Sequence, residues 1–257
     1  MSEERNGPEA INGLEATKTA LPGHLYLVGV GPGAPDLLTL RALKILESVD
    51  LIIAPRSSAS EASLVLGIVR PHLRHQEVIE HIYPMARDRE QTARSWRRMA
   101  DLCVERLRTG QSVAHVTLGD PLIYSTCTYL MEEIGERIEP SQIHFVSGIS
   151  AMQAAAALLD QTLLTQNDRL MLMPADDMDA VAAALDQCET LVLYKIAHRL
   201  DTVIELLRQR DLLQDARLVS HAEQPGERII RALDEIEGGR LGYMSVLIVR
   251  IGHRDWK

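Results

Sequence analysis

The sequence predicts an α/β protein built from two lobes with a binding cleft between them. Three observations support this prediction. Short apolar stretches alternate with amphipathic helical stretches along most of the chain. Two glycine-rich turns, GVGPGA at 29–34 and LGD at 118–120, directly follow apolar stretches, which is where parallel sheets present binding groups. A polar segment, RIEPSQ at 137–142, interrupts the pattern near the middle of the chain and indicates a domain boundary.

The domain organisation follows from these composition changes. We expect a flexible tail over 1–22, a first α/β domain over 23–138 and a second over 139–257. The first 22 residues are polar and mixed in charge, without the apolar core of a signal peptide. No apolar run approaches the roughly 20 residues that span a bilayer, so we expect no membrane association.

The composition excludes several classes of protein. A hydrophobic content of 46% with 25% charged residues is typical of soluble globular chains. The net charge of −9 argues against nonspecific binding to nucleic acid. Three widely separated cysteines indicate reduced thiols in a cytoplasmic protein. The histidine cluster of His72, His75 and His81 lacks helical ligand spacing, so we predict no metal site.

Apolar periodicity places the elements of the first half. Strands are expected over 24–30, 49–54, 77–82 and 113–118, and helices over 37–48, about 60–70, 88–110 and through Met131. Asp36 is expected to cap the first helix and Pro55 to stop the second strand. Asp88 with Gln91 resembles a capping box that opens the long helix.

The second half continues the alternation of strands and helices. Strands are expected over 143–146, 169–173, 190–194, 216–219 and 244–251, and an alanine-rich helix begins at Ser150. We assign the strand at 143–146, with the Ser147-Gly148 turn after it, to the second lobe.

The stretch LGDPLIYST at 118–126 is the most informative feature of the chain. Gly119 permits close backbone approach, and Asp120 sits at the tip of the turn. Three hydroxyl side chains follow within one turn: Tyr124, Ser125 and Thr126. The Asp120 carboxylate could bind a cationic ligand group, or it could close its own turn. The hydroxyls of Ser125 and Thr126 could bind a ligand or cap the next helix.

The first glycine-rich turn, 29–34, formally satisfies the dinucleotide pattern G-x-G-x-x-G/A. A Rossmann oxidoreductase is therefore an alternative. Two details weaken this alternative. First, Pro32 lies where backbone amides would face a pyrophosphate. The acid at the expected distance, Asp50, begins the second strand, whereas a ribose-binding acid should end it.

Five segments in order resemble the tetrapyrrole methylases: VGVGPGAPDLLTLRAL, YPMARDREQTARSW, TLGDPLIYSTCTYL, GISAMQAAAA and TLVLYK. The resemblance extends over about residues 24–251. The family consists of S-adenosylmethionine-dependent enzymes of cobalamin biosynthesis and related pathways. GDP followed by YST, the PM-x-R-D element and YMSVLIV are most similar to the branch that methylates carbon 20 of precorrin-2 or its cobalt form.

This resemblance implies a bilobal class III methyltransferase fold, a homodimer, a tetrapyrrole substrate and S-adenosylmethionine in the cleft between the lobes. By motif position it also implies cofactor contacts from Pro32, Leu118, Gly119, Asp120, Ile123, Ser125, Thr126, Ser150, Ala151, Lys195 and Ala222. The cofactor needs a few polar groups on an apolar cleft rather than a phosphate cradle.

Methyl transfer requires alignment of the reacting atoms and a weak base for the departing proton. Candidate catalytic residues are Asp120, Lys195 and Tyr243, although Lys195 and Tyr243 could equally be solvated rim residues. The substrate class is rich in carboxylates, and arginine suits carboxylates. Among the arginines between 70 and 98, Arg87 is the first candidate for binding substrate.

Two positions depart from the family pattern. Ala34 stands where most relatives have aspartate, and Ser147 replaces the usual proline of the second-half turn. Two further alternatives therefore remain: a binding protein that has lost catalysis, and a methylase that acts on another ring carbon or another molecule.

Overall fold

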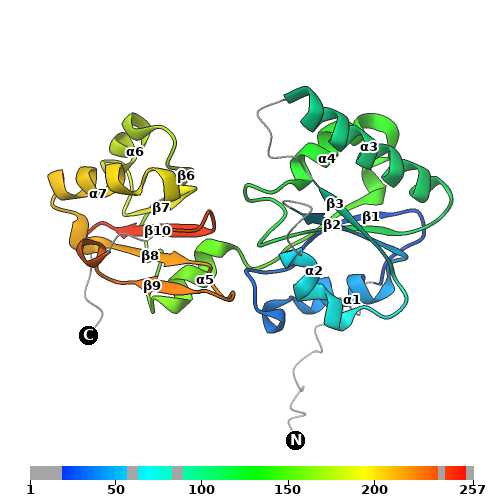
Figure 1. The fold of residues 1–257 in the computed structure, drawn as a ribbon, viewed down its shortest axis with the longest axis horizontal. Helices are drawn as coiled ribbons and strands as arrows, with labels where there is room; N and C mark the ends of the chain where they lie inside the picture. Colours follow the sequence, from blue (N-terminus) through cyan, green and yellow to red (C-terminus); the bar gives the residue numbers. More distant parts are fainter. Residues whose placement is uncertain (1–18, 57–62, 83–88, 237–240, 253–257) are drawn as a thin grey trace, which may run out of the picture.

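The computed structural model describes residues 19–56, 63–82, 89–236 and 241–252. Within these residues the strands form two five-stranded sheets, one in each lobe (Figure 1). The predicted α/β class is therefore confirmed. None of the described helices is long and apolar enough to cross a membrane.

The first sheet is parallel throughout, in the order β3-β2-β4-β1-β5. Its strands are β1 (Leu25–Gly29), β2 (Leu51–Arg56), β3 (Glu77–Ile82), β4 (Val113–Thr117) and β5 (Ile143–Val146). One face packs against α1 (Leu40–Ser48) and α2 (Leu64–Val69), and the other against α3 (Arg89–Arg108) and α4 (Cys127–Ile134) (Figure 1). Because the strands are parallel, the carboxyl ends of β1, β4 and β5 meet at one edge.

The second sheet is mixed, in the order β6-β7-β10-β8-β9. Its strands are β6 (Leu170–Pro174), β7 (Thr190–Tyr194), β8 (Ala216–Ser220), β9 (Arg228–Ile230) and β10 (Ser245–Arg250). Only β6 and β7 pair in parallel; β10 is antiparallel to β7 and β8. Helix α5 (Ala151–Leu158) packs on one face, and α6 (Met178–Leu185) and α7 (Leu200–Gln209) on the other. The carboxyl ends of β7 and β8 point toward the first lobe (Figure 1).

The strand at 143–146 belongs to the first sheet, so its assignment to the second lobe is wrong. It pairs in parallel with β1, and Leu25 faces Ile143. The polar segment at 137–142 is a connection inside the first lobe, and sheet membership changes only after Val146. The expected tail also ends earlier than residue 22. The amide of Ala20 donates to Ser48 Oγ at 2.8 Å, and that of Leu21 to the Tyr26 hydroxyl at 2.8 Å.

Two element ends differ from the sequence prediction. Helix α1 begins at Leu40, where Thr39 Oγ1 accepts from the Ala42 amide at 3.2 Å, while Asp36 lies in the preceding 3-10 turn. Strand β2 continues through Pro55, which pairs with β3. On its other side β2 pairs with β4 only as far as Ile53. The missing N–H of Pro55 therefore interrupts no hydrogen bond between β2 and β4. Asp88 of the expected capping box lies outside the described residues.

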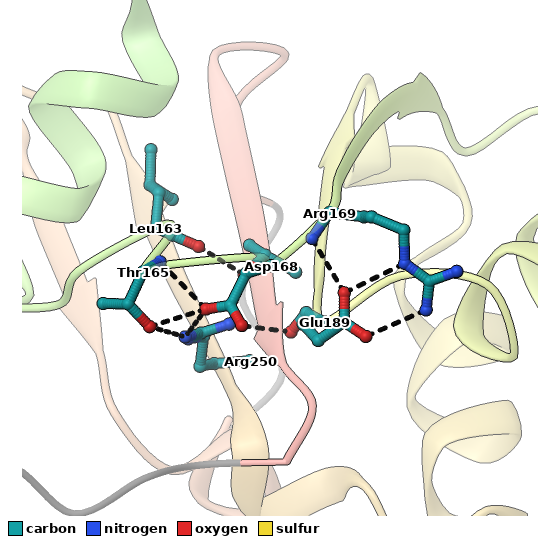
Figure 2. A network of polar contacts seen from close by, with 7 residues as sticks. Leu163, Thr165, Asp168, Arg169, Glu189 and Arg250 are labelled. Carbon is teal, nitrogen blue, oxygen red and sulfur yellow. Dashed lines mark hydrogen bonds and ion pairs between the residues drawn. The ribbon is translucent and has the colours of Figure 1, made fainter.

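A buried ion pair anchors the last strand of the second sheet. Arg250 is 6% exposed and donates to Asp168, to Thr190 Oγ1 at 3.0 Å and to the carbonyl of Glu189 at 3.2 Å (Figure 2). Asp168 also accepts from the amide and hydroxyl of Thr165, at 2.9 and 2.8 Å. Burial makes each of these bonds costly to lose, because a buried charge without its partner is strongly unfavourable.

This cluster predicts a stability loss in acid. Hydrogen bonds from Thr165 and Arg250 lower the pKa of Asp168 to about 2, below its value of about 4 in an unfolded chain. The stabilisation is therefore complete above about pH 4 and is lost as the pH falls toward 2. We expect the melting temperature of the wild type to fall more steeply over this range than that of Asp168→Asn. Equal slopes in a thermal denaturation series would contradict this prediction.

Candidate functional site

Four glycines bring three loops together at the carboxyl ends of β1, β4 and β5. A Cβ added to Gly148 would lie 2.1 Å from the carbonyl oxygen of Gly119, and one added to Gly29 would lie 2.5 Å from the same atom. Gly31 and Gly119 exchange backbone hydrogen bonds of 2.7 and 3.3 Å, and both have positive φ, +80° and +70°. We call Gly29, Gly31, Gly119 and Gly148 the glycine junction. Larger residues cannot approach this closely, so the junction fixes the loops relative to one another.

Asp120 stabilises the glycine junction through two hydrogen bonds. Its Oδ1 accepts from the amide of Leu122 at 2.9 Å, and its Oδ2 accepts from the amide of Gly148 at 3.1 Å. The carboxylate therefore closes its own turn and also ties the loop after β4 to the loop after β5. These two contacts are those of a positioning residue.

The hydroxyls after Asp120 have different surroundings. Ser125 Oγ donates to Thr117 Oγ1 at 3.1 Å and accepts from the amide of Cys127 at 3.1 Å, at the start of α4. Thr126 Oγ1 is buried and has no hydrogen-bond partner among the described residues. An unpaired buried hydroxyl is unfavourable, so a ligand that paired with it would gain affinity.

Tyr124 connects the two lobes. Its hydroxyl donates to the carbonyl of Leu172 in β6 at 3.4 Å, and its ring centroid lies 5.7 Å from that of Tyr194. The Nζ atom of Lys195, which follows β7, lies 5.7 Å from the centre of the Tyr124 ring. Both Tyr124 and Lys195 have positive φ, 46° and 55°. Such strained conformations persist where the surrounding structure enforces them, often at functional sites.

A second contact between the lobes involves the first glycine-rich turn. Gln224 Nε2 donates to the carbonyl of Pro32 at 2.6 Å, and a Cβ on Gly33 would lie 2.4 Å from the carbonyl oxygen of Glu223. Ala222 immediately precedes this contact and is buried against α5.

The hydrogen bonds of this turn also bear on the dinucleotide alternative. The amide of Val30 donates to Thr117 at 2.9 Å, and the amide of Gly31 donates to Gly119. These donors are therefore not free to bind a pyrophosphate.

Helix α5 begins beside the junction. Ser150 is buried and caps the helix in a capping box with Gln153. A Cβ on Gly119 would lie 3.9 Å from both the Ser150 Cα and the Ala151 amide nitrogen. At the preceding turn, the carbonyl of Ser147 accepts from Thr39 Oγ1 at 3.3 Å, a contact that helps to hold the turn.

The structure brings most of the expected site residues to the two facing edges. Around the junction lie Pro32, Leu118, Gly119, Asp120, Ile123, Ser125, Thr126, Ser150 and Ala151, and the second lobe contributes Lys195 and Ala222. Tyr243 is 61% exposed just before β10. Arg87 lies outside the described residues. Sequence reasoning missed Gln224 and His221 in the loop after β8, and it missed the contact of Tyr124 with the second lobe.

Two titratable groups beneath the loop are electrically neutral. His115 is fully buried, its Nδ1 lies 3.6 Å from Cys127 Sγ, and burial lowers its pKa to about 4. Burial raises the pKa of Cys127 to about 11. The thiol is thus a packing group rather than a nucleophile at neutral pH.

Among the described residues no group of three or more His, Cys, Asp or Glu side chains is placed to hold a metal ion.

Residues 24–236 match the model of the Tetrapyrrole (Corrin/Porphyrin) Methylases. The cobalt-precorrin-2 C(20)-methyltransferase of Salmonella typhimurium is 34% identical over 238 residues, which cover 91% of this chain and 98% of that protein.

Solved structures share the fold. A cobalt precorrin-4 methyltransferase superposes with a TM-score of 0.66 at 22% identity and covers 88% of this chain and 94% of its own. Uroporphyrin-III C-methyltransferase from Thermus thermophilus, complexed with S-adenosylhomocysteine, has a TM-score of 0.59 at 22% identity and covers 88% of this chain and 96% of its own.

Proposed function

This chain belongs to the tetrapyrrole (corrin/porphyrin) methylases, and on that basis we propose that it transfers a methyl group from S-adenosylmethionine to a tetrapyrrole. The substrate that we propose is cobalt-precorrin-2, methylated at ring carbon 20 in cobalamin biosynthesis. The observation that carries this proposal is the 34% identity with the Salmonella relative over 91% of this chain and 98% of that protein.

The residues at the junction fit the proposed cofactor. Among the described residues, the buried hydroxyl of Thr126 has no hydrogen-bond partner. Gly119, which has no side chain, lies close to the start of α5. Pro32, residues 118–120, Thr126 and the Ser150–Ala151 pair would hold S-adenosylmethionine. When bound, it supplies a methyl group already activated on a sulfonium, so the main task of the chain in the transfer step is to align the reacting atoms.

The second lobe would contribute to substrate binding. The Tyr124 ring is 52% exposed, and the Lys195 ammonium lies over it. An exposed aromatic face suits a flat macrocycle, and an ammonium beside it suits a carboxylate of the substrate. Arg87 remains a proposed substrate contact and Tyr243 a proposed catalytic group, whereas the hydrogen bonds of Asp120 favour positioning over direct catalysis.

A pair of variants at Tyr124 tests this substrate surface. We expect Tyr124→Ala to raise the KM for the tetrapyrrole about fivefold, since a lost aromatic contact costs roughly 1 kcal/mol. Tyr124→Phe keeps the ring and loses only the long bond to Leu172, so its KM should stay near that of the wild type. Steady-state kinetics that show equal KM values for the alanine variant and the wild type would remove Tyr124 from the substrate site.

The methyl-transfer reaction itself tests the proposed function. The purified chain is incubated with cobalt-precorrin-2 and S-adenosylmethionine labelled in its methyl group, with metal-free precorrin-2 in a parallel reaction. We expect the product to gain one methyl group, with the label at carbon 20. A label at another ring carbon would assign the chain to another branch of the family. Cofactor binding without transfer to either substrate would favour the binding protein that has lost catalysis.

We also propose a cytoplasmic homodimer whose lobes divide after β5, at about residues 147–150. All three cysteines are free and buried, as expected in a reducing compartment. The edge strand β5 exposes 45% of Phe145, which a partner subunit could cover. Light scattering should give twice the 28.6 kDa mass of one chain; the mass of a single chain would contradict the dimer.

A further inference from the structure

His221 lies at the edge of the second lobe that faces the first. It directly follows β8, and its amide donates to the carbonyl of Met244 at 2.8 Å. Its φ is +53°, which breaks the alternation of side chains along the strand. Two and three residues later, Glu223 and Gln224 contact the first glycine-rich turn. The histidine therefore belongs to the loop that joins the second lobe to the proposed cofactor site.

A chain of hydrogen bonds holds the imidazole. Ser220 Oγ lies 3.0 Å from His221 Nδ1, and Ser245 Oγ lies 2.9 Å from Ser220 Oγ and 2.8 Å from the carbonyl oxygen of Gly242. Both serines are almost completely buried, at 1% and 3% exposure. The ring also packs on Gly242, where an added Cβ would lie 2.0 Å from its Cε1. The position of the ring is thus fixed from two sides.

The direction of this chain determines the tautomer of His221. The Gly242 carbonyl can only accept, so the single hydroxyl proton of Ser245 is donated to it. Ser245 then accepts from Ser220, and Ser220 in turn accepts from His221. The neutral imidazole therefore carries its proton on Nδ1 and a lone pair on Nε2. Among the described residues Nε2 has no hydrogen-bond partner, so it can accept a proton.

We propose that Nε2 of His221 is the base that removes the proton from the methylated ring carbon. This inference rests on the proposed function. The π electrons of the enamine-like ring carbon form the new bond to the methyl carbon, and the carbon–sulfur bond breaks with its electron pair on sulfur, leaving neutral S-adenosylhomocysteine. The macrocycle then holds one positive charge. Its ring carbon loses a proton to Nε2, the C–H electron pair restores the conjugated system, and the imidazolium releases the proton to water.

The other candidate bases are less suited to this step. Both carboxylate oxygens of Asp120 already accept backbone amides. Lys195 places its ammonium over the Tyr124 ring, where it suits a substrate carboxylate. Tyr243 has an exposed side chain, and no neighbouring group in the described part of the chain holds its hydroxyl in place. A histidine whose tautomer is set by a second group matches the usual design of a general base.

The test compares His221→Asn with the wild type. The asparagine amide can still donate to Ser220, as Nδ1 does, but it offers no basic nitrogen. We expect kcat to fall at least about 100-fold, while the KM for the tetrapyrrole and the Kd for S-adenosylmethionine stay within about twofold. Ser220→Ala should lower kcat less, because only the preference for one tautomer is lost. His221→Gln replaces the asparagine variant if that variant does not fold.

Nitrogen-15 NMR of the wild-type imidazole gives a readout that needs no turnover. The proposal predicts a neutral His221 ring protonated on Nδ1, and a mixture of tautomers in Ser220→Ala. A neutral ring protonated on Nε2, or wild-type kcat in His221→Asn, would overturn the assignment. Failure of the proposed function is a separate outcome, because the wild type would then transfer no methyl group; the NMR result still decides the tautomer.

Discussion

Gly148→Ala is expected to weaken binding of S-adenosylmethionine at least about 100-fold, which corresponds to about 2.7 kcal/mol. The new Cβ would lie 2.1 Å from the carbonyl oxygen of Gly119 and 2.8 Å from the carbonyl carbon of Gly29. Both contacts are with backbone, so no side-chain rotation relieves them. Overpacking of this kind costs roughly 1–3 kcal/mol or more, and here it separates the three loops that form the site. Calorimetric titration measures the change in affinity.

Gly67→Ala is the matched control. Gly67 lies inside α2, and an added Cβ meets no other atom within 4 Å. Alanine is favoured over glycine in a helix by about 1 kcal/mol, so this variant should melt no lower than the wild type and bind the cofactor equally well. Wild-type affinity in Gly148→Ala would contradict the role that we give to the glycine junction.

Asp120→Ala should raise the Kd for the cofactor about tenfold or more. Removal of the carboxylate leaves the amides of Leu122 and Gly148 without an acceptor. Hydrogen bonds to a charged group contribute about 1.5–3 kcal/mol each, and water can replace part of that loss at this half-buried turn. The melting temperature should fall in parallel, since the same two bonds hold the loops of the folded protein together.

Asp120→Asn separates positioning from chemistry. The amide keeps one oxygen as an acceptor but turns a donor toward the second amide, so a positioning role predicts a Kd between those of wild type and Asp120→Ala. If Asp120 instead acted as the base, Asp120→Asn would lose kcat while its Kd and melting temperature stayed unchanged. Calorimetry, thermal denaturation and single-turnover kinetics on the same three proteins distinguish the two roles.

The sequence predicts elements where the periodicity is local. The expected bounds of β3 and β7 are those observed, because both are regular apolar or alternating stretches bounded by polar residues. The local pattern does not predict which strands pair with one another. Nothing within Ile143–Val146 encodes its pairing with β1, because pairing is decided by contacts distant in sequence. The sequence does not locate the cap of α1, since Thr39 and Asp36 are both good N-caps and only the path of the chain selects Thr39.

The sequence likewise predicts only part of the candidate site. Both glycine-rich turns are legible because close backbone approach demands glycine, and their positions after strands place them at one sheet edge. The left-handed conformations of Tyr124, Lys195 and His221 have no signature in the sequence. Tertiary contacts between and within the lobes impose them, so the contact between Tyr124 and Lys195 and the serine chain behind His221 become visible only in the folded protein.

Titration of the purified wild-type chain and of Gly148→Ala with S-adenosylmethionine, monitored by calorimetry, tests whether the glycine junction binds the cofactor. We expect saturable binding at one site per chain, with a Kd of roughly micromolar order, and loss of that binding in the variant. Absence of any saturable heat with the wild type at millimolar ligand would contradict a cofactor site at the glycine junction.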